Sequence, residues 1–312
     1  MTSEAVCPAP GVTLPPAPCS LCPRQCHALR RPYHGVGFCR MGSLPVVARA
    51  APHFGEEPVI SGTRGSGAIF FAGCGLGCDF CQNSAISHER QGQALTVPEL
   101  AACMRRLVDS GVHNLNLVTA GHFAPQVRQA LLLLRQGATR PPVPVVYNCG
   151  GYESVETLRL LEDVVDIYLP DFKFADPTLA ARHANALDYP EVATSALREM
   201  LRQKGGLQVE AGLAVKGVLV RHLVLPGGVE NSIRVLRHLC DTFGEGLWLA
   251  LMAQYTPWGN LAPPMDRAVT QTEYDAVREV AQALFYHGFT QEITSAGRDQ
   301  TPAFDGSGVE RA

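Results

Sequence analysis

The chain has 312 residues, which allows one or two domains at roughly 150 residues per domain. Its composition, 46% hydrophobic and 18% charged, is that of a globular protein and excludes disorder over most of the chain. The net charge of −3 gives no strongly basic surface for nucleic acid. The opening residues show no secretory signal, and no run of about 18 apolar residues predicts a transmembrane helix. We therefore expect a cytoplasmic protein whose partners include neither nucleic acid nor a membrane.

The cysteines are the most informative part of the composition. There are 11, an odd number, and seven of them fall in two tight clusters. Secreted disulfide frameworks are normally short and even-numbered, whereas clustered thiols in a cytosolic chain more often bind metal or carry out redox chemistry. Cys7, Cys103 and Cys240 have no partner nearby in the sequence, and we expect them to be stray or buried thiols.

Residues 1–50 are rich in Pro, Cys and Arg and have too few apolar side chains to form a core, which predicts a metal-stapled N-terminal extension. Four thiolates can close a structural zinc site or hold an iron–sulfur cluster, and the spacing leaves both open. Neighbouring basic residues, Arg24 and Arg30, are expected to lower the pKa of the thiols. The four cysteines are Cys19, Cys22, Cys26 and Cys39.

The hydrophobic pattern of residues 51–295 predicts alternating strands and helices. The polar composition of residues 296–312 predicts a loose tail. Alternating strands and helices form a parallel sheet, and six units are fewer than the eight of a closed barrel. The predicted fold class is therefore α/β, a partial (β/α)6 barrel of parallel strands with a small Cys-rich N-terminal extension. Strands are expected at 68–72, 114–118, 143–147, 165–169, 218–225 and 247–253. Helices are expected at 96–108, 124–136, 154–162, in segments up to Lys204, at 231–243 and at 272–286. Thr96 and Glu99 should form a capping box at the start of the first helix. Gly137 and His287-Gly288 are expected to end the second and the last.

Three cysteines, Cys74, Cys78 and Cys81, follow the first of these strands with the spacing C-x3-C-x2-C. They lie in the loop at its carboxyl end, where ligands bind in such folds. Thiolates suit iron–sulfur clusters, and three of them would leave one iron of a [4Fe–4S] cube open to a small molecule. A zinc site with a borrowed fourth ligand and a ferredoxin-like electron-transfer centre are the alternatives.

The motif and its surroundings resemble the radical S-adenosylmethionine (radical SAM) proteins. Phe80, just before the last cysteine, matches the C-x3-C-x-Φ-C pattern of that superfamily, while Gly75 stands where relatives often have Asn. Residues 55–71 (GEEPVISGTRGSGAIFF) and 78–87 (CDFCQNSAIS) resemble the relatives of pyruvate formate-lyase activating enzyme that carry an N-terminal Cys-rich segment. The resemblance extends from Cys19 to about Gly288.

The resemblance implies an enzyme that reductively cleaves S-adenosylmethionine at a [4Fe–4S] cluster. The resulting 5′-deoxyadenosyl radical would abstract hydrogen, in the activases from a glycine of a partner protein. The substrate, a protein or a small molecule, is not identified by the sequence, and a donor such as flavodoxin or ferredoxin would supply the electron. Two alternatives are a non-catalytic iron–sulfur electron-transfer protein and a zinc-stabilised binding module.

The resemblance also implies six cofactor-binding residues. One is Phe80 in the cysteine loop, and the others lie at the ends of the predicted strands. Asp171 and Lys173 match a D-x-K segment that reaches S-adenosylmethionine, and Arg221 matches an arginine that contacts the cofactor carboxylate. Asn148 corresponds to an Asp or Asn that meets the cofactor, although positions 149 and 150 depart from the commoner Thr-Ser. Gly121 lies where relatives bind the methionyl amino group through the backbone.

Overall fold

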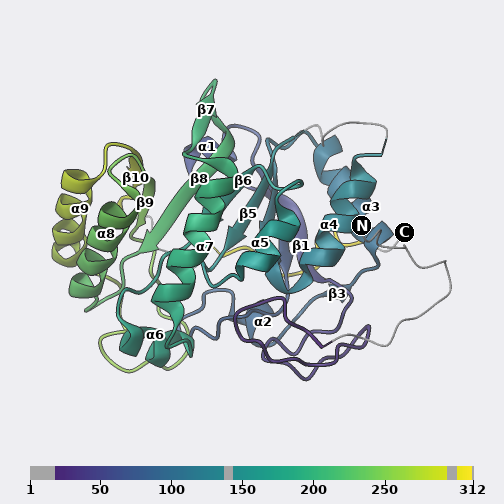
Figure 1. Cartoon of the computed structure of the whole chain (residues 1–312), viewed down its shortest axis with the longest axis horizontal. Coiled ribbons are helices and arrows are strands. Elements are labelled where there is room, and N and C mark those ends of the chain that lie inside the picture. The colour runs from purple at the N-terminus through teal and green to yellow at the C-terminus, as the bar shows by residue number, and fades with distance from the viewer. Residues whose placement is uncertain (1–17, 137–142, 294–300, 311–312) are drawn as a thin grey trace, which may run out of the picture.

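The computed structural model describes residues 18–136, 143–293 and 301–310. Within these residues, seven strands pair in parallel and follow one another across the sheet in chain order (Figure 1). Because the order does not reverse, the winding is that of a barrel and not of a doubly wound sheet. The seven strands are β2 (Ser66–Phe71), β4 (Leu115–Val118), β5 (Val145–Cys149), β6 (Ile167–Pro170), β8 (Leu213–Leu223), β9 (Trp248–Met252) and β10 (Gly288–Thr290).

Three further strands pair antiparallel. β1 (Val46–His53) pairs with β2 and with β3 (Gln93–Ala94) at one edge of the sheet, and β7 (Gln208–Glu210) pairs with β8. The helices connect the parallel strands, and α3, α4, α5 and α7 lie in front of the sheet in Figure 1. They are α1 (Pro58–Ser61), α2 (Ser84–Ser87), α3 (Val97–Asp109), α4 (Ala124–Leu134), α5 (Val155–Leu161), α6 (Pro177–Ala184), α7 (Tyr189–Lys204), α8 (Val229–Phe243) and α9 (Gln271–Leu284).

Local sequence explains the main elements. All residues of β2, β5 and β6 are buried, as expected for parallel strands covered on both faces. The capping box of α3 is confirmed, because Thr96 Oγ1 accepts a hydrogen bond from Glu99 N while the Glu99 carboxylate accepts one from Thr96 N at 2.7 Å. Gly137, the expected end of α4, lies outside the described residues. The fold is therefore mixed α/β with a large parallel sheet, as predicted.

The ends of the central stretch differ from the prediction. The expected domain boundary at residue 50 falls inside β1, which extends the sheet beyond β2. Gly288, expected as a helix stop, instead begins β10, while α9 ends at Leu284. A three-residue strand next to a helix has no recognisable periodicity, so its partner β9 decides the conformation.

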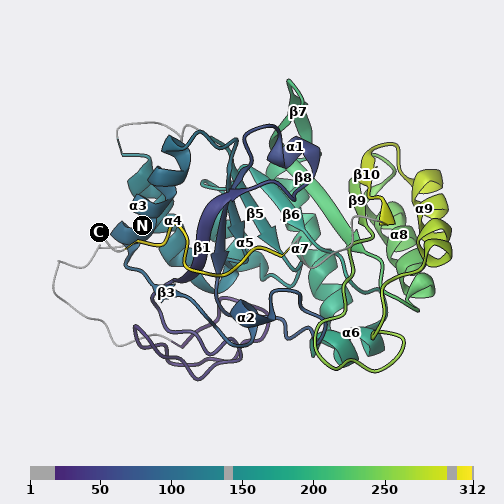
Figure 2. The ribbon, with the colours of Figure 1, turned by 180° about the vertical axis from the view of Figure 1, so that it is seen from behind.

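The described part of the tail, 301–310, is held against the sheet instead of being loose. Ala50 N donates to Ser307 O at 2.9 Å, and Gly306 N donates to Ala48 O at 3.0 Å. Figure 2 shows this yellow segment running past β1. Val309 is only 5% exposed, so apolar burial holds a segment that its polar composition predicted to be free.

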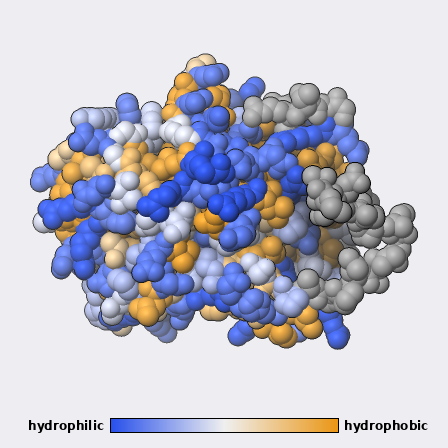
Figure 3. Space-filling model, viewed as in Figure 1, coloured by the Kyte–Doolittle hydropathy of each residue, from blue (hydrophilic) through white to orange (hydrophobic). Residues whose placement is uncertain are grey.

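The outer surface is mixed in character. On the face in Figure 3, hydrophilic residues gather over α7 and hydrophobic residues are spread in small groups. Of the helices in the described ranges, none has the length and hydrophobicity needed to cross a bilayer.

Candidate functional site

The cysteine loop begins where β2 ends. Gly73 has φ +81°, a backbone conformation that side chains rarely tolerate, and a Cβ there would collide with the Met41 side chain. The chain therefore turns at Gly73 and directs Cys74, Cys78 and Cys81 to the carboxyl edge of the sheet.

Hydrogen bonds orient two of the three sulfur atoms. The backbone N–H of Leu76 donates to Cys74 Sγ at 3.3 Å, and the Ser87 hydroxyl donates to Cys81 Sγ at 3.3 Å. Donors of this kind tune and orient thiolate ligands. Burial raises the pKa of Cys74 to about 12 and also raises the pKa of Cys78. A bound metal reverses this effect, because it deprotonates a coordinating thiol.

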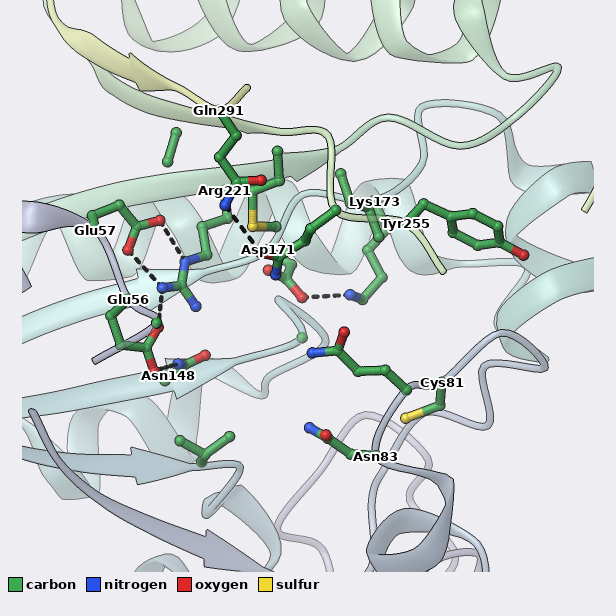
Figure 4. Close-up of a pocket in the computed structure, with 18 of the residues that line it drawn as sticks. Glu56, Glu57, Cys81, Asn83, Asn148, Asp171, Lys173, Arg221, Tyr255 and Gln291 are labelled. Atoms are coloured by element: carbon green, nitrogen blue, oxygen red, sulfur yellow. Dashed lines mark hydrogen bonds and ion pairs between the residues drawn. The ribbon is translucent and has the colours of Figure 1, made fainter. Parts of the chain in front are cut away.

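A cavity of about 520 Å³ opens at the carboxyl ends of the parallel strands. The three cysteines line it together with five of the six predicted cofactor-binding residues, and Figure 4 shows several of these side chains facing the same space. The predicted site residues thus come from separate strands to one place, as the barrel-like order requires. The five are Phe80, Asn148, Asp171, Lys173 and Arg221.

Asp171 and Lys173 form an ion pair after β6, with the Lys173 ammonium donating to the Asp171 carboxylate. Burial opposes the charge on Lys173, yet Asp171 raises the pKa of Lys173 above its usual value. The Lys173 charge also acts on the thiols of Cys74 and Cys78. This pair therefore supplies both signs of charge beside the cysteine loop.

Arg221, on β8, is engaged by two carboxylates that the sequence interpretation did not assign. Its Nε donates to Glu57 Oε1 at 2.8 Å, its Nη2 donates to Glu57 Oε2 at 2.6 Å, and Nη2 also contacts Glu56. Although burial opposes charge here, Arg221 lowers the pKa of Glu56. The only signal was that both glutamates lie in 55–71, a stretch that carried the resemblance but no assigned role.

Gly121 is the one predicted cofactor-binding residue that does not line this cavity. It lines a smaller one with Cys22, Cys74 and Glu153, and a Cβ on Gly121 would collide with the Glu153 carboxylate. Burial raises the pKa of Glu153 to about 7. The neighbouring His122 is 4% exposed, and burial lowers its pKa to about 4.

Cys149, at the end of β5, also lines the main cavity and was not predicted as a site residue. It is 2% exposed, and burial raises its pKa well above the usual value. The charges that act on Cys149 include Asp171 and Lys173, which also act on Cys78. A fourth thiol thus faces the cavity from the strand side.

The N-terminal cysteines lie close enough to one another for their charges to interact. Burial raises the pKa of Cys22 to about 12 and also raises the pKa of Cys39, where it outweighs the lowering by the Arg30 charge. In the described ranges, no three or more His, Cys, Asp or Glu side chains are gathered as the ligands of one metal ion. Sulfur atoms that bind different irons of a cluster are spaced more widely than ligands of one ion. A second metal centre here stays a prediction.

No family model matches the chain. The uncharacterized protein MJ0674 of Methanocaldococcus jannaschii is 27% identical over 273 residues, which cover 85% of this chain and 74% of that protein. SuiB of Streptococcus suis, solved bound to S-adenosylmethionine, aligns with a TM-score of 0.48 and 11% identity over 70% of this chain and 48% of SuiB. Methylornithine synthase (PylB) aligns with a TM-score of 0.47 and 15% identity over 70% of this chain and 63% of that chain. The chain spans about half the length of SuiB, and at these TM-scores the likenesses carry no argument about function.

Proposed function

We propose that the chain is a radical SAM enzyme that holds a [4Fe–4S] cluster on Cys74, Cys78 and Cys81 and binds S-adenosylmethionine beside it. The observation that carries the proposal is that one cavity brings the three thiols of this loop together with the Asp171–Lys173 pair. When bound, the two cofactors supply reductive cleavage of the sulfonium S–C5′ bond, which gives methionine and a 5′-deoxyadenosyl radical that abstracts hydrogen from a substrate.

The donor set of this site suits the cluster. Three thiols on a short loop match three irons, and the Leu76 N–H and the Ser87 hydroxyl already donate to two of the sulfur atoms. Lys173 keeps a positive charge beside the thiols, which favours their anionic, metal-binding form. A zinc module or a closed electron-transfer centre would have no use for the charged groups that line the rest of the cavity.

The chain's own residues would bind and orient S-adenosylmethionine. Asp171 offers a carboxylate to the ammonium group of the ligand, and Lys173 offers a cation to its carboxylate. Phe80, which is 7% exposed, packs with Phe174 at a ring separation of 6.3 Å and with Tyr255 at 6.3 Å. This aromatic wall excludes water beside the cysteine loop, where a reactive radical needs a dry site.

The subtype we propose follows the resemblance to the activating enzymes. In this subtype the enzyme abstracts hydrogen from a protein partner, and flavodoxin or ferredoxin supplies the electron.

The experiment compares wild type with three variants, Cys74→Ala, Cys78→Ala and Cys81→Ala, after anaerobic reconstitution. We expect brown wild-type protein with about four irons at this site. It should form 5′-deoxyadenosine from S-adenosylmethionine and a reductant, and none of the three variants should do so. Cys240→Ala, on α8 and outside the cavity, serves as the matched control. Full cleavage by any of the three variants would refute the assignment.

We also propose a second metal centre on Cys19, Cys22, Cys26 and Cys39. Backbone N–H groups of Arg24 and Met41 donate to Cys22 and Cys39, as in metal-binding cysteine turns. Metal analysis of a Cys22→Ser/Cys26→Ser double variant tests this. A drop in zinc indicates a structural site, a drop of about four irons indicates an auxiliary cluster, and no change in either metal excludes the centre.

A further inference from the structure

Arg221 uses only two of its three guanidinium nitrogens on protein partners. Nε and Nη2 donate to Glu57 and Glu56, whereas Nη1 has no hydrogen-bond partner within the described part of the chain. Arg221 is 8% exposed and lines the cavity. In Figure 4 the remaining nitrogen points away from both glutamates toward the open space of the site. A donor that faces the cavity without a protein acceptor is available to an acceptor on a bound ligand.

Glu57 fixes the plane of the guanidinium. Its two carboxylate oxygens accept from Nε at 2.8 Å and from Nη2 at 2.6 Å, which is the bidentate fork geometry. The side chains of Glu56 and Glu57 are each 8% exposed, so water does not compete for these bonds. Glu56 is itself held by Asn116, whose Nδ2 donates to its Oε1 at 2.8 Å. Rotation of the guanidinium would break this whole set of bonds.

The charges of Arg221, Glu56 and Glu57 also determine which ligand charge is favoured. Two carboxylates against one guanidinium leave a net charge of −1 in a buried position, because arginine keeps its proton in proteins. Such a group favours a ligand with net positive charge. S-adenosylmethionine carries a sulfonium and an ammonium against a single carboxylate, and so has a net charge of +1.

We propose that Glu56 and Glu57 are positioning residues that hold Arg221 with Nη1 facing the cavity, where Nη1 donates to bound S-adenosylmethionine. This rests on the proposed function. The two glutamates lie between β1 and α1 and reach Arg221 across 164 and 165 residues of chain. They tie the start of the sheet to β8 and set the direction of the donor, from positions that themselves line the cavity.

The test measures the affinity for S-adenosylmethionine by calorimetry on reconstituted, unreduced protein, so that binding is read without turnover. Glu57→Gln should weaken binding about 10-fold or more, because loss of the fork frees the guanidinium. Glu56→Gln keeps the fork and should weaken binding less. Glu230→Gln, an exposed glutamate that pairs with Arg234 on α8, should leave affinity unchanged.

A double-mutant cycle separates positioning from a general loss of charge. If Glu57 acts through Arg221, Glu57→Gln added to Arg221→Lys should cause no further loss of affinity. Additive losses, or Glu57→Gln with wild-type affinity, would overturn the inference. If Glu57→Gln does not fold, Glu56→Gln and Arg221→Lys, each alone and combined, give the same cycle for Glu56. Wild-type protein that does not bind S-adenosylmethionine at all would refute the proposed function instead.

Discussion

At the scale of single residues, the chemistry of the site depends on charge held in a buried place. The Asp171–Lys173 pair follows β6 and acts on the thiols of the cysteine loop, while Arg221 on β8 forms ion pairs with two glutamates. Buried ion pairs contribute little to stability because desolvation offsets their attraction. Their place in one cavity is therefore better explained by ligand binding than by folding.

Asp171→Ala and Lys173→Ala should retain the cluster iron but bind S-adenosylmethionine more weakly. Loss of a hydrogen bond to a charged group costs roughly 1.5–3 kcal/mol, which is about 10- to 100-fold in affinity. Calorimetry together with iron analysis checks this. Unchanged affinity in both variants would show that this pair does not bind the cofactor.

A Cys149→Ala variant tests whether the cluster has three cysteine ligands, which leaves one iron open, or four. If three thiols hold the cluster, Cys149→Ala should keep about four irons in the site and should cleave S-adenosylmethionine like wild type. An electron-transfer centre needs four cysteines, and in that case this variant would lose iron. Iron analysis and the visible absorption of the reconstituted variant decide between the two.

The residue-level predictions rest on signals that are local in sequence. The spacing of Cys74, Cys78 and Cys81 and the D-x-K segment identify residues that line one cavity, and their roles stay predictions. Glu56 and Glu57 could not be assigned in this way, since their meaning depends on an arginine 164 or 165 residues later. Gly121 lies beside Glu153 in the smaller cavity, which Cys74 also lines, and its role stays a prediction.

At the scale of elements, the N-terminal segment is packed onto the cysteine loop. Arg24 Nε donates to Gly75 O at 2.8 Å and Nη2 donates to Ala184 O at 3.1 Å, while its guanidinium lies 4.0 Å from the centroid of the Phe38 ring. The segment also meets α5, since the Thr157 hydroxyl donates to Leu21 O at 2.6 Å. Arg24 thus connects three parts of the chain at the loop that carries the thiols.

Arg24→Ala should loosen the cysteine loop and lower retention of the cluster. The lost bonds come from a charged donor, each worth roughly 1.5–3 kcal/mol. The rate of iron release to a chelator should rise about 10-fold or more. Arg31→Ala, an exposed change in the same segment, is the control. Equal iron release from Arg24→Ala and wild type would show that the segment does not support the loop.

The sequence predicted the central strands and helices because burial on both sides of a parallel sheet leaves long apolar runs. It missed β1 and β10 for different reasons. β1 (VVARAAPH) contains an arginine and a proline and lies toward an edge of the sheet, so its pattern is weak. β10 has three residues, and only its pairing with β9 identifies it.

At the scale of the whole molecule, stability should depend on pH through buried histidines. His222 Nδ1 lies 2.6 Å from Phe172 O and its Nε2 lies 2.9 Å from Ser232 Oγ. Burial lowers the pKa of His222 to about 4, against 6.5 in the unfolded chain. As pH falls below 6.5, the unfolded chain binds the proton first. This contribution to the free energy of unfolding is therefore complete above pH 6.5 and is lost between pH 6.5 and 4.

Urea unfolding of wild type and His222→Gln between pH 7.5 and 5 measures this effect. The wild-type free energy of unfolding should fall by roughly 2 kcal/mol more than that of the variant as the pH is lowered to 5. Glu153 has the opposite dependence, because its pKa is raised to about 7, so only the difference between the two proteins isolates His222. Parallel pH curves for the two proteins would contradict the account.

The central claim is that one cavity holds both the cluster and S-adenosylmethionine. Electron paramagnetic resonance of the reconstituted, reduced protein, recorded with and without S-adenosylmethionine, tests it most directly. We expect the signal of a reduced [4Fe–4S] cluster and a clear change in its g-values on addition of the ligand. A cluster signal that saturating S-adenosylmethionine leaves unchanged would contradict the account.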